Sequence, residues 1–599
     1  MNPNQTVVEN FLAQAKECGS CCAMMFKKDA RYHHISFNQL ANEVKQLAVC
    51  WQKLGVVKGD KIAILSGNSP EWAKVDLSAQ LVGAVIIPIH NNLSVKIIEY
   101  ILAHAEVKVL FISGADLVKK ILAVKDNLPN LKTVICIDDA VNELSKKFNQ
   151  VLSFNQFRAL NSNEEFISVA VSADDLCSII YTSGTTGLPK GVMLTHRNFI
   201  SDAMMTAQAV LVKSDDIFLS FLPLSHVLER TAGYYIPLLC GATIAYAESF
   251  KQLAKNIKEI KPTILIAVPR VFEKIYDAVW DKIRASSTNR RALFLWALKQ
   301  KPKTISYWLA DTFVFNKVRQ TMGGRLRFAV SGGAALDHKI AKFFHRVGIL
   351  ILEGYGLTET APVLAVNGEA SYHFGSVGKV LSGVELKIAD DKEILVRGAN
   401  IMIGYYKNEA DTKAVIDADG WLHTGDLGFL HEDGFLTIIG RKKEMIVSSG
   451  GKNIWPEPLE QELNRDQYID QSMIIGHKRQ FVSALIVPNW EELAIYLRGE
   501  SLALKTREEL VKDDRILHFF AERIFKINEH ISEYEHIRQF TLLTKEFSAD
   551  NDELTPTLKL RRHVVEHHYG KEIEEMYKKY DATAGCIRGI WVFYTKTVF

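Results

Sequence analysis

Short apolar runs alternate with amphipathic helical patterns along much of the chain. The clearest helical pattern follows Ser36, a favourable N-cap, and stops at Gly55. Its apolar side chains recur on one face, at Leu40, Val44, Leu47, Trp51 and Leu54. Apolar runs of strand length lie at Lys61–Ser66, Gly83–Ile89, Val107–Ser113, Thr133–Ile137, Cys177–Thr182, Thr263–Val268 and Leu326–Ser331. This alternation predicts an α/β fold with largely parallel sheets.

The pattern changes near Gly383, where short strands follow one another across polar turns. These strands are expected at Val384–Ile388, Glu393–Val396 and Phe435–Ile439 and indicate an antiparallel, β-barrel-like subregion. Shorter elements follow Arg441, including strands at Ser472–Gly476 and Ala484–Pro488 and a charged helical stretch at Ser501–Ser532. We predict a large N-terminal domain of layered α/β sheets over residues 1–440, a small α+β domain over 441–570, and an atypical tail over 571–599.

Composition and charge exclude several classes of protein. Of 599 residues, 48% are apolar and 24% are charged, and the net charge is only +3. This is ordinary globular composition without a bulk positive field, so we expect no nucleic-acid partner. Eight cysteines are too sparse for a disulfide scaffold. Cys18 and Cys21 have C-x-x-C spacing without a second metal-ligating pair, which favours reduced cytosolic thiols.

The best candidate for a membrane span is too short. Thr231–Ala247 has 17 residues and contains Pro237 and Gly241, whereas a spanning helix needs about 20 apolar residues. A buried helix followed by a strand explains this segment better. The N-terminus lacks the basic start and apolar run of a secretory signal. We expect a cytoplasmic protein, and the sequence leaves open peripheral attachment to the inner face of a membrane and a homodimeric state.

A loop rich in glycine and hydroxyl side chains is the sharpest local signal. Tyr181–Gly191 reads Y-T-S-G-T-T-G-L-P-K-G and follows an apolar run. Its open backbone amides and hydroxyls can wrap a polyphosphate, with Lys190 as a point charge. It lacks the Walker spacing, and the next helix is expected only near Thr195. An ordinary surface turn remains the alternative for this loop taken by itself.

The run S-G-T-T-G-x-P-K-G resembles the signature of the adenylate-forming, or AMP-binding, superfamily, which includes acyl-CoA synthetases, luciferases and peptide-synthetase adenylation domains. Further motifs follow in the family's order, and the resemblance covers nearly the whole chain. It implies a large N-terminal domain, a small mobile C-terminal domain, and ATP-binding residues at Thr182, Ser183, Gly184, Thr185, Thr186, Gly187 and Lys190. Thr185 is also an expected Mg²⁺ residue.

Two further motifs resemble the family's nucleotide site. Leu326–Leu336 reads as strand, glycine turn and helix, and the resemblance assigns Gly332, Gly333 and Ala334 to the adenine pocket; a plain tight turn is the alternative. Ile349–Thr360 offers an aromatic ring for adenine, a hydroxyl for the α-phosphate and a carboxylate for Mg²⁺. These are Tyr355 with Gly356, Thr358 and Glu359. A degenerate dinucleotide fingerprint at Gly354-x-Gly356 is disfavoured, because Glu359 would repel pyrophosphate.

Later motifs complete the resemblance. Asp426 and Arg441 resemble the family's two ribose contacts, and Lys443 matches its hinge position. An Asx-turn and a solvated basic turn are the alternatives. Lys559 in T-P-T-L-K resembles the late catalytic lysine in the form found in the long-chain branch, with Arg561 and Arg562 close by.

The segment L-P-L-S-H-V-L-E-R also resembles the long-chain branch. It would place His226 near the substrate carboxylate or the thiol path, and a histidine satisfied in the core is the alternative.

The resemblance therefore implies a long-chain fatty acyl-CoA synthetase that uses a fatty acid, ATP with Mg²⁺, and coenzyme A as co-substrate. Thr358, Glu359, His226 and Lys559 would be its catalytic residues. A peptide-synthetase-type adenylation protein, a luciferase-like oxygenase and a non-catalytic acyl-binding protein are the alternatives. The tail Asp581–Phe599 matches no usual family ending.

Overall fold

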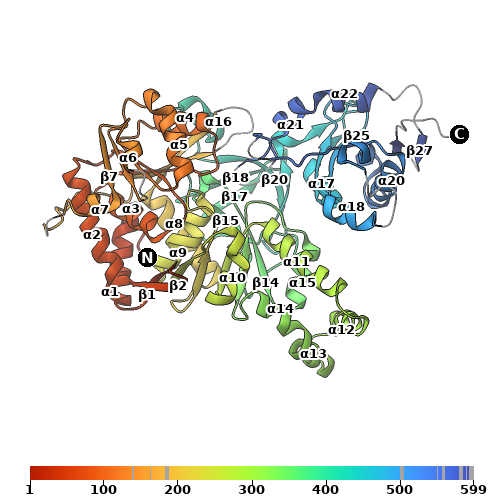
Figure 1. Cartoon of the computed structure of the whole chain (residues 1–599), viewed down its shortest axis with the longest axis horizontal. Helices are drawn as coiled ribbons and strands as arrows, with labels where there is room; N and C mark the ends of the chain where they lie inside the picture. Colours follow the sequence, from red (N-terminus) through yellow and green to blue (C-terminus); the bar gives the residue numbers. More distant parts are fainter. Residues whose placement is uncertain are drawn as a thin grey trace. The chain divides into compact units, whose positions relative to one another are not determined.

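The computed structural model describes residues 1–137, 141–161, 164–182, 188–498, 505–548, 551–555, 560–578, 585–587 and 590–592. The chain divides into two compact units (Figure 1). The first unit extends to Ile438, and the second begins at Ile439 and also takes in Gly425–Gly428. The predicted division between residues 440 and 441 falls close to this point, and the three-part organisation stays a prediction.

Two sheets form the body of the first unit. The eight-stranded sheet has the order β19 (Gly404–Tyr405), β9 (Lys190–Thr195), β8 (Leu176–Thr182), β4 (Val85–Pro88), β3 (Lys61–Leu65), β5 (Val109–Ile112), β6 (Thr133–Cys136) and β7 (Gln150–Ser153). Strands β8, β4, β3, β5, β6 and β7 are parallel, while β9 and β19 are antiparallel additions. The predicted parallel α/β pattern is confirmed here.

The second sheet has nine strands. Its order is β16 (Lys379–Val380), β15 (Val363–Val366), β14 (Leu350–Gly356), β13 (Phe328–Ser331), β12 (Ile264–Ala267), β10 (Ile217–Ser220), β11 (Thr243–Tyr246), β1 (Cys22–Lys28) and β2 (Arg31–Ser36). The central strands are parallel, and β2, β15 and β16 run antiparallel to their neighbours. The carboxyl ends of β10, β12, β13 and β14 therefore lie along one edge.

Helices form three layers around these two sheets. The central layer holds α1 (Val7–Cys18), α2 (Phe37–Lys53), α3 (Pro70–Leu81), α8 (His196–Val210) and α9 (Ile236–Leu239). The outer layer on the eight-stranded sheet holds α4 (Val95–His104) and α5 (Ala115–Val124). The outer layer on the nine-stranded sheet holds α10 (Leu253–Ile260), α11 (Pro269–Arg284), α12 (Thr288–Lys299), α13 (Ile305–Ala310), α14 (Asn316–Thr321) and α15 (His338–Arg346). Three shorter helices are α6 (Val141–Leu144), α7 (Phe154–Arg158) and α16 (Glu409–Val415).

The apolar strand sequences follow from this layering. Ile62 and Ile64 of β3 pack into the central helical layer, whereas Ala63 and Leu65 pack against α4 and α5. Both faces of the strand are thus covered, which explains a continuous apolar run in place of an alternating one. Helix α2 begins as predicted, because Ser36 accepts a hydrogen bond from the Gln39 backbone N–H and forms a capping box.

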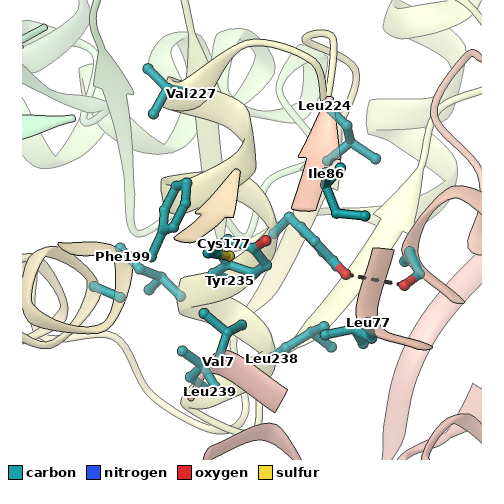
Figure 2. Close-up of a cluster of buried hydrophobic side chains, with 14 of the residues drawn as sticks. Val7, Leu77, Ile86, Cys177, Phe199, Leu224, Val227, Tyr235, Leu238 and Leu239 are labelled. Carbon is teal, nitrogen blue, oxygen red and sulfur yellow. Dashed lines mark hydrogen bonds between the residues drawn. The ribbon is translucent and has the colours of Figure 1, made fainter. Parts of the chain in front are cut away.

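The segment considered above as a membrane span, Thr231–Ala247, begins in this central layer. Its residues form a buried π-helical segment, Glu229–Tyr235, followed by α9 and then by β11. Figure 2 shows Tyr235, Leu238 and Leu239 among buried apolar side chains from several elements. Within the described residues, no helix combines the length and apolarity needed to cross a bilayer.

A separate four-stranded sheet follows the nine-stranded one. Its order is β17 (Val384–Ile388), β18 (Glu393–Gly398), β20 (Leu422–Leu430) and β21 (Leu436–Arg441). Strands β17 and β18 pair antiparallel, and an isolated bridge between Lys379 and Phe435 connects β16 to the segment before β21. The predicted change to short antiparallel strands is confirmed.

The second unit is built on a three-stranded sheet of β24 (Ile469–Ile475), β25 (Val482–Pro488) and β26 (Ile537–Leu542). One face packs against α17 (Pro456–Asn464), α18 (Trp490–Tyr496), α19 (Arg507–Leu510) and α20 (Asp514–Asn528). The other face packs against α21 (Arg562–His568) and α22 (Gly570–Lys578). Two small hairpins are β22 (Ile446–Val447) with β23 (Asn453–Ile454), and β27 (Gly585–Ile587) with β28 (Ile590–Val592).

Candidate active site

The β8–β9 hairpin presents the two ends of the glycine-rich loop. Thr182 ends β8 and pairs across the hairpin with Lys190, which begins β9. The intervening candidates Ser183, Gly184, Thr185, Thr186 and Gly187 lie outside the described residues, so their roles stay predictions. The next helix, α8, is capped by Thr195 as expected. The strand–loop–strand arrangement separates this loop from a Walker loop, in which a helix follows at once.

Lys190 has two partners in the structure. Its Nζ lies 2.6 Å from Asp411 Oδ2 and 5.1 Å from the centroid of the Tyr405 ring. Both members of the ion pair are more than a third exposed, so the pair contributes little to stability. An incoming polyphosphate can therefore displace Asp411 at small cost.

Glu359 and Lys190 approach the same tyrosine. The Tyr405 hydroxyl donates a hydrogen bond to Glu359 Oε1 at 2.8 Å. Burial, reinforced by the Glu359 carboxylate, raises the pKa of Tyr405 well above its usual range, so this hydroxyl stays a donor. Tyr405 thus lies between the predicted phosphate-binding cation and the predicted metal-binding carboxylate.

Sequence reasoning did not identify Tyr405. It lies in the two-residue strand β19, which pairs with Val192 of β9 across more than two hundred residues of chain. A strand this short has no recognisable period, and its pairing is long-range. The adjacent aromatic pair Tyr405–Tyr406 after Gly404 is the only local signal.

Several predicted residues follow the carboxyl ends of parallel strands. Strand β13 leads into Gly332, Gly333 and Ala334, and the neighbouring β14 ends in Tyr355 and Gly356. The structure therefore brings the two predicted adenine-binding segments to one edge of the nine-stranded sheet. The segment carrying His226 follows β10 at the same edge.

Two of these glycines also have backbone reasons to be glycine. Gly333 has a φ of +86°, in the left-handed region that other residues rarely adopt. A Cβ at Gly356 would fall 1.8 Å from the Pro362 carbonyl oxygen. After Gly356 the chain makes the short turn Thr358–Thr360 and returns as antiparallel β15. No helix follows directly, so the dinucleotide-fingerprint alternative is wrong.

His226 is half-buried beside a second histidine. Its Nδ1 accepts a hydrogen bond from the Leu228 backbone N–H at 3.2 Å, and its ring centroid lies 6.1 Å from that of His90. His90 Nδ1 lies 2.8 Å from Ser225 Oγ, and burial lowers the pKa of His90 to about 4. His90 is therefore neutral near pH 7, and its ring places no positive charge beside His226.

The predicted ribose residues contact each other within the second unit. Arg441 Nε lies 3.0 Å from Asp426 Oδ1, with the Asp426 side chain only 5% exposed. The pair connects the end of β21 to β20, so one carboxylate is held in a fixed place. Lys443 lies in the exposed turn Lys442–Glu444 that follows. The ribose and hinge roles stay predictions.

Lys559 lies outside the described residues, but its two basic neighbours do not. Arg561 pairs with Asp552 at 3.2 Å, and Arg562 pairs with Glu460 at 2.5 Å. Leu554 and Leu560 form an isolated bridge on either side of Lys559 in the sequence. Both neighbouring arginines are thus engaged in ion pairs of the second unit.

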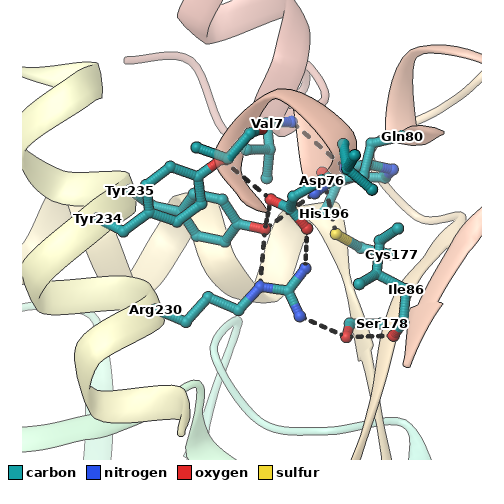
Figure 3. A network of polar contacts seen from close by, with 12 residues as sticks. Val7, Asp76, Gln80, Ile86, Cys177, Ser178, His196, Arg230, Tyr234 and Tyr235 are labelled. Atoms are coloured by element: carbon teal, nitrogen blue, oxygen red, sulfur yellow. Dashed lines mark hydrogen bonds and ion pairs between the residues drawn. The ribbon is translucent and has the colours of Figure 1, made fainter. Parts of the chain in front are cut away.

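A fully buried polar network surrounds Arg230, the last residue of the segment that carries His226 (Figure 3). Arg230 pairs with Asp76 of α3 at 2.5 Å, and neither side chain is exposed. Arg230 also donates to Ser178 Oγ of β8 at 2.7 Å and to the Tyr235 hydroxyl at 3.0 Å. The network therefore ties the π-helical segment to the strand that leads into the glycine-rich loop.

Glu229, next to Arg230, is expected to make the stability of the protein depend on pH. Burial raises its pKa to about 8, and its Oε1 has no hydrogen-bond partner among the described residues. Between about pH 4.5 and pH 8 the folded protein keeps a proton that the unfolded chain releases, so this group makes stability fall as pH rises. Glu229→Gln removes the ionisation. Thermal unfolding should show that the Tm of Glu229→Gln, relative to that of the wild type, increases from about pH 4.5 to pH 8. A Tm difference that does not change with pH would contradict the assignment of a buried, protonated Glu229.

The comparisons with known proteins identify the family of the chain. The model of the AMP-binding enzyme family matches residues 11–406, and that of the AMP-binding enzyme C-terminal domain matches residues 443–581. The chain belongs to the AMP-binding enzyme family.

Curated relatives match nearly end to end. The long-chain-fatty-acid–CoA ligase FadD15 of Mycobacterium bovis is 33% identical, over 92% of this chain and 93% of its own length. The long-chain-fatty-acid–CoA ligase ACSBG2 of Homo sapiens is 31% identical, over 96% and 92%. The fatty acyl-CoA synthetase A of Dictyostelium discoideum is 31% identical, over 92% and 87%.

Solved structures share the fold at lower identity. The adenylation domain of a carboxylate reductase from Mycobacterium chelonae superposes with a TM-score of 0.80 at 20% identity, covering 96% of this chain and 92% of that one. The anthranilate CoA ligase AuaEII gives a TM-score of 0.75 at 21% identity, covering 96% and 99%. The predicted fold class is thus confirmed.

Proposed function

We propose that this protein is a long-chain fatty acyl-CoA ligase. It activates a fatty acid with ATP to form an acyl-AMP and pyrophosphate, then transfers the acyl group to coenzyme A and releases AMP. The observation that carries the proposal is the similarity to long-chain ligases at 31–33% identity over more than nine tenths of the chain.

The first step must overcome a poor leaving group. A carboxylate resists attack by a thiol, whereas its mixed anhydride with AMP loses AMP readily. The carboxylate oxygen attacks the α-phosphorus of ATP, and the bond to pyrophosphate breaks. We assign Thr182 and Lys190 to the phosphates and Thr358 to the α-phosphate, with the loop residues 183–187 alongside.

The residues around Glu359 fit a bound Mg²⁺. Glu359 is half-buried, Tyr405 occupies one of its oxygens, and it has no ion pair among the described residues. A hard oxygen ligand that is free of basic partners suits Mg²⁺, which commonly binds through one or two carboxylates and substrate phosphates. Glu359, with Thr185, would hold the ion, and bound Mg²⁺ would offset the charge of the departing pyrophosphate.

The second step needs a different set of groups. The thiol of coenzyme A attacks the acyl carbonyl, and AMP leaves with the bonding electrons. We propose that the second unit turns about Lys443 between the steps, which withdraws Lys559 after adenylation. His226 is proposed to lie near the reacting carboxylate, and Asp426 with Arg441 to hold the ribose.

The place of action is proposed as the cytoplasm at a membrane surface, because long-chain acids partition into lipid. A homodimeric state stays a prediction.

The decisive experiment supplies the purified protein with ATP, Mg²⁺ and fatty acids from short to very long chain. We expect acyl-AMP and pyrophosphate without coenzyme A, and acyl-CoA with AMP after its addition. Light emission with oxygen would indicate the luciferase-like alternative, and acyl-AMP that coenzyme A does not consume would favour the carrier-dependent one. Binding of acids without any acyl-AMP would overturn the proposal in favour of an acyl-binding protein.

Glu359→Gln should raise the Mg²⁺ concentration needed for half-maximal acyl-AMP formation by about tenfold. The amide keeps the shape of the side chain and its contact with Tyr405 but removes the charge that attracts the ion. Titrating Mg²⁺ at saturating ATP measures the shift. An unchanged Mg²⁺ dependence would remove Glu359 from the metal site.

Tyr405→Phe should raise the KM for ATP with Mg²⁺ several-fold. The lost hydroxyl positions the Glu359 carboxylate and is worth about one hydrogen bond to a charged group, 1.5–3 kcal/mol. Tyr406→Phe is the matched control, because in the described part of the chain the Tyr406 hydroxyl donates to Glu106, at 3.4 Å, and not to Glu359. Equal kinetics for the two variants would contradict a positioning role for Tyr405.

A further inference from the structure

Exposed apolar side chains gather on one part of the first unit. Helices α12 and α13 and the following π-helical segment Asp311–Phe315 lie at the margin of that unit, away from its two sheets (Figure 1). Three large side chains there are strongly exposed: Ile305 at 81%, Trp308 at 62% and Phe313 at 58%. Leu293, Leu295, Trp296 and Leu309 are exposed as well. We call α12, α13 and this π-helical segment, residues 288–315, the apolar finger.

The finger has two apolar faces, and among the residues that the structure describes only one of them packs against the rest of this unit. Ala310, Val314 and Phe315 are buried in the core that covers the nine-stranded sheet. Ile305, Trp308 or Leu309, and Phe313 recur at helical spacing on the other face. Large apolar side chains that gather at an exposed surface commonly mark a contact site, so this face is expected to contact a partner.

The positive charge of the finger favours an anionic partner. Residues 288–315 contain five lysines and arginines and one aspartate, a net +4, although the whole chain carries only +3. The five cations are Arg290, Arg291, Lys299, Lys301 and Lys303, all exposed and without an ion pair among the described residues. The single acid, Asp311, is already paired with Arg319 at 2.6 Å.

We propose that the finger docks on an anionic lipid surface. Tryptophan and phenylalanine side chains enter the boundary between headgroups and acyl chains, while lysine and arginine stems extend along apolar surface and place their charges among anionic headgroups. A protein partner would need a matching acidic rim around an apolar groove, whereas a membrane offers both layers at once. This surface goes beyond the adenylation chemistry and does not depend on it.

Vesicle flotation of the full-length protein tests the proposal. We expect binding to phosphatidylcholine vesicles that contain phosphatidylglycerol, at least tenfold weaker binding to phosphatidylcholine alone, and weakening as salt rises. Ile305→Ser/Trp308→Ser/Phe313→Ser should lose binding at least tenfold. Lys299→Glu/Lys301→Glu/Lys303→Glu should lose the preference for the anionic lipid.

A matched control removes the same number of exposed apolar side chains elsewhere in the first unit. Val57→Ser/Ile167→Ser/Phe250→Ser should bind vesicles as the wild type does. Acyl-AMP formation from a short, water-soluble acid should be the same in all variants, which separates failure of docking from failure of the proposed chemistry. Vesicle binding unaffected by the finger variants would overturn the proposal. So would sedimentation showing that the apolar variant breaks up a dimer formed without lipid.

Discussion

Lys559→Ala is expected to lose acyl-AMP formation by about 10²–10³-fold while still converting supplied acyl-AMP and coenzyme A to the thioester. In the first step negative charge accumulates around the α-phosphorus, and a fixed ammonium group lowers that barrier most in a site that excludes water. In the second step the thiol attacks an acyl carbon whose leaving group is already AMP. That step therefore gains little from a cation at the α-phosphate.

Two assays separate the half-reactions. ATP–pyrophosphate exchange in the presence of fatty acid measures adenylation, and consumption of synthetic acyl-AMP with coenzyme A measures thioester formation. Arg561→Ala is the matched control, because this neighbouring cation is paired with Asp552 in the structure and should affect both assays weakly. Equal losses in both half-reactions for Lys559→Ala would reject the assignment.

The sequence predicted the elements that depend on local pattern. Strand β3 was recognisable because both of its faces are buried, which makes it continuously apolar. Helix α2 was recognisable because its capping box and apolar stripe are both local features. The order of motifs likewise indicated the family, which the family models and the curated relatives confirm.

Long-range pairings could not be predicted in the same way. Tyr405 joins Lys190 and Glu359 only because the two-residue strand β19 pairs with β9. Likewise, the ion pairs of Arg561 with Asp552 and of Arg562 with Glu460 are visible only in the structure. A single sequence shows a basic cluster in such cases, but not which of its cations is already engaged.

The buried pair Asp76–Arg230 is another contact that the sequence did not predict. Breaking this pair is expected to have the largest effect on stability. In α3, Asp76 lies in a twelve-residue helix in which nearly every residue is buried, so helical amphipathicity gave no signal. Its partner Arg230 lies in a segment that was notable only for His226. The contact joins α3 to the π-helical segment within the central helical layer.

Asp76→Ala should destabilise the first unit by about 3–5 kcal/mol, because it leaves a guanidinium buried without its counter-charge. The hydroxyls of Tyr234 and Tyr235, which both donate to Asp76 Oδ2, also lose their acceptor. Urea unfolding followed by tryptophan fluorescence measures the loss, since Trp72 packs against the Arg230 guanidinium.

The double variant Asp76→Leu/Arg230→Met distinguishes charge from packing. Removing both charges and filling the space with apolar atoms should recover much of the stability lost in Asp76→Ala, because neither ion then has to be desolvated. If the double variant is no more stable than Asp76→Ala, the tyrosine hydroxyls and Ser178, rather than the unpaired guanidinium, account for the loss. In that case the ion pair would serve mainly to fix the position of the π-helical segment. The rate of acyl-AMP formation would then fall by a larger factor than the equilibrium constant for folding.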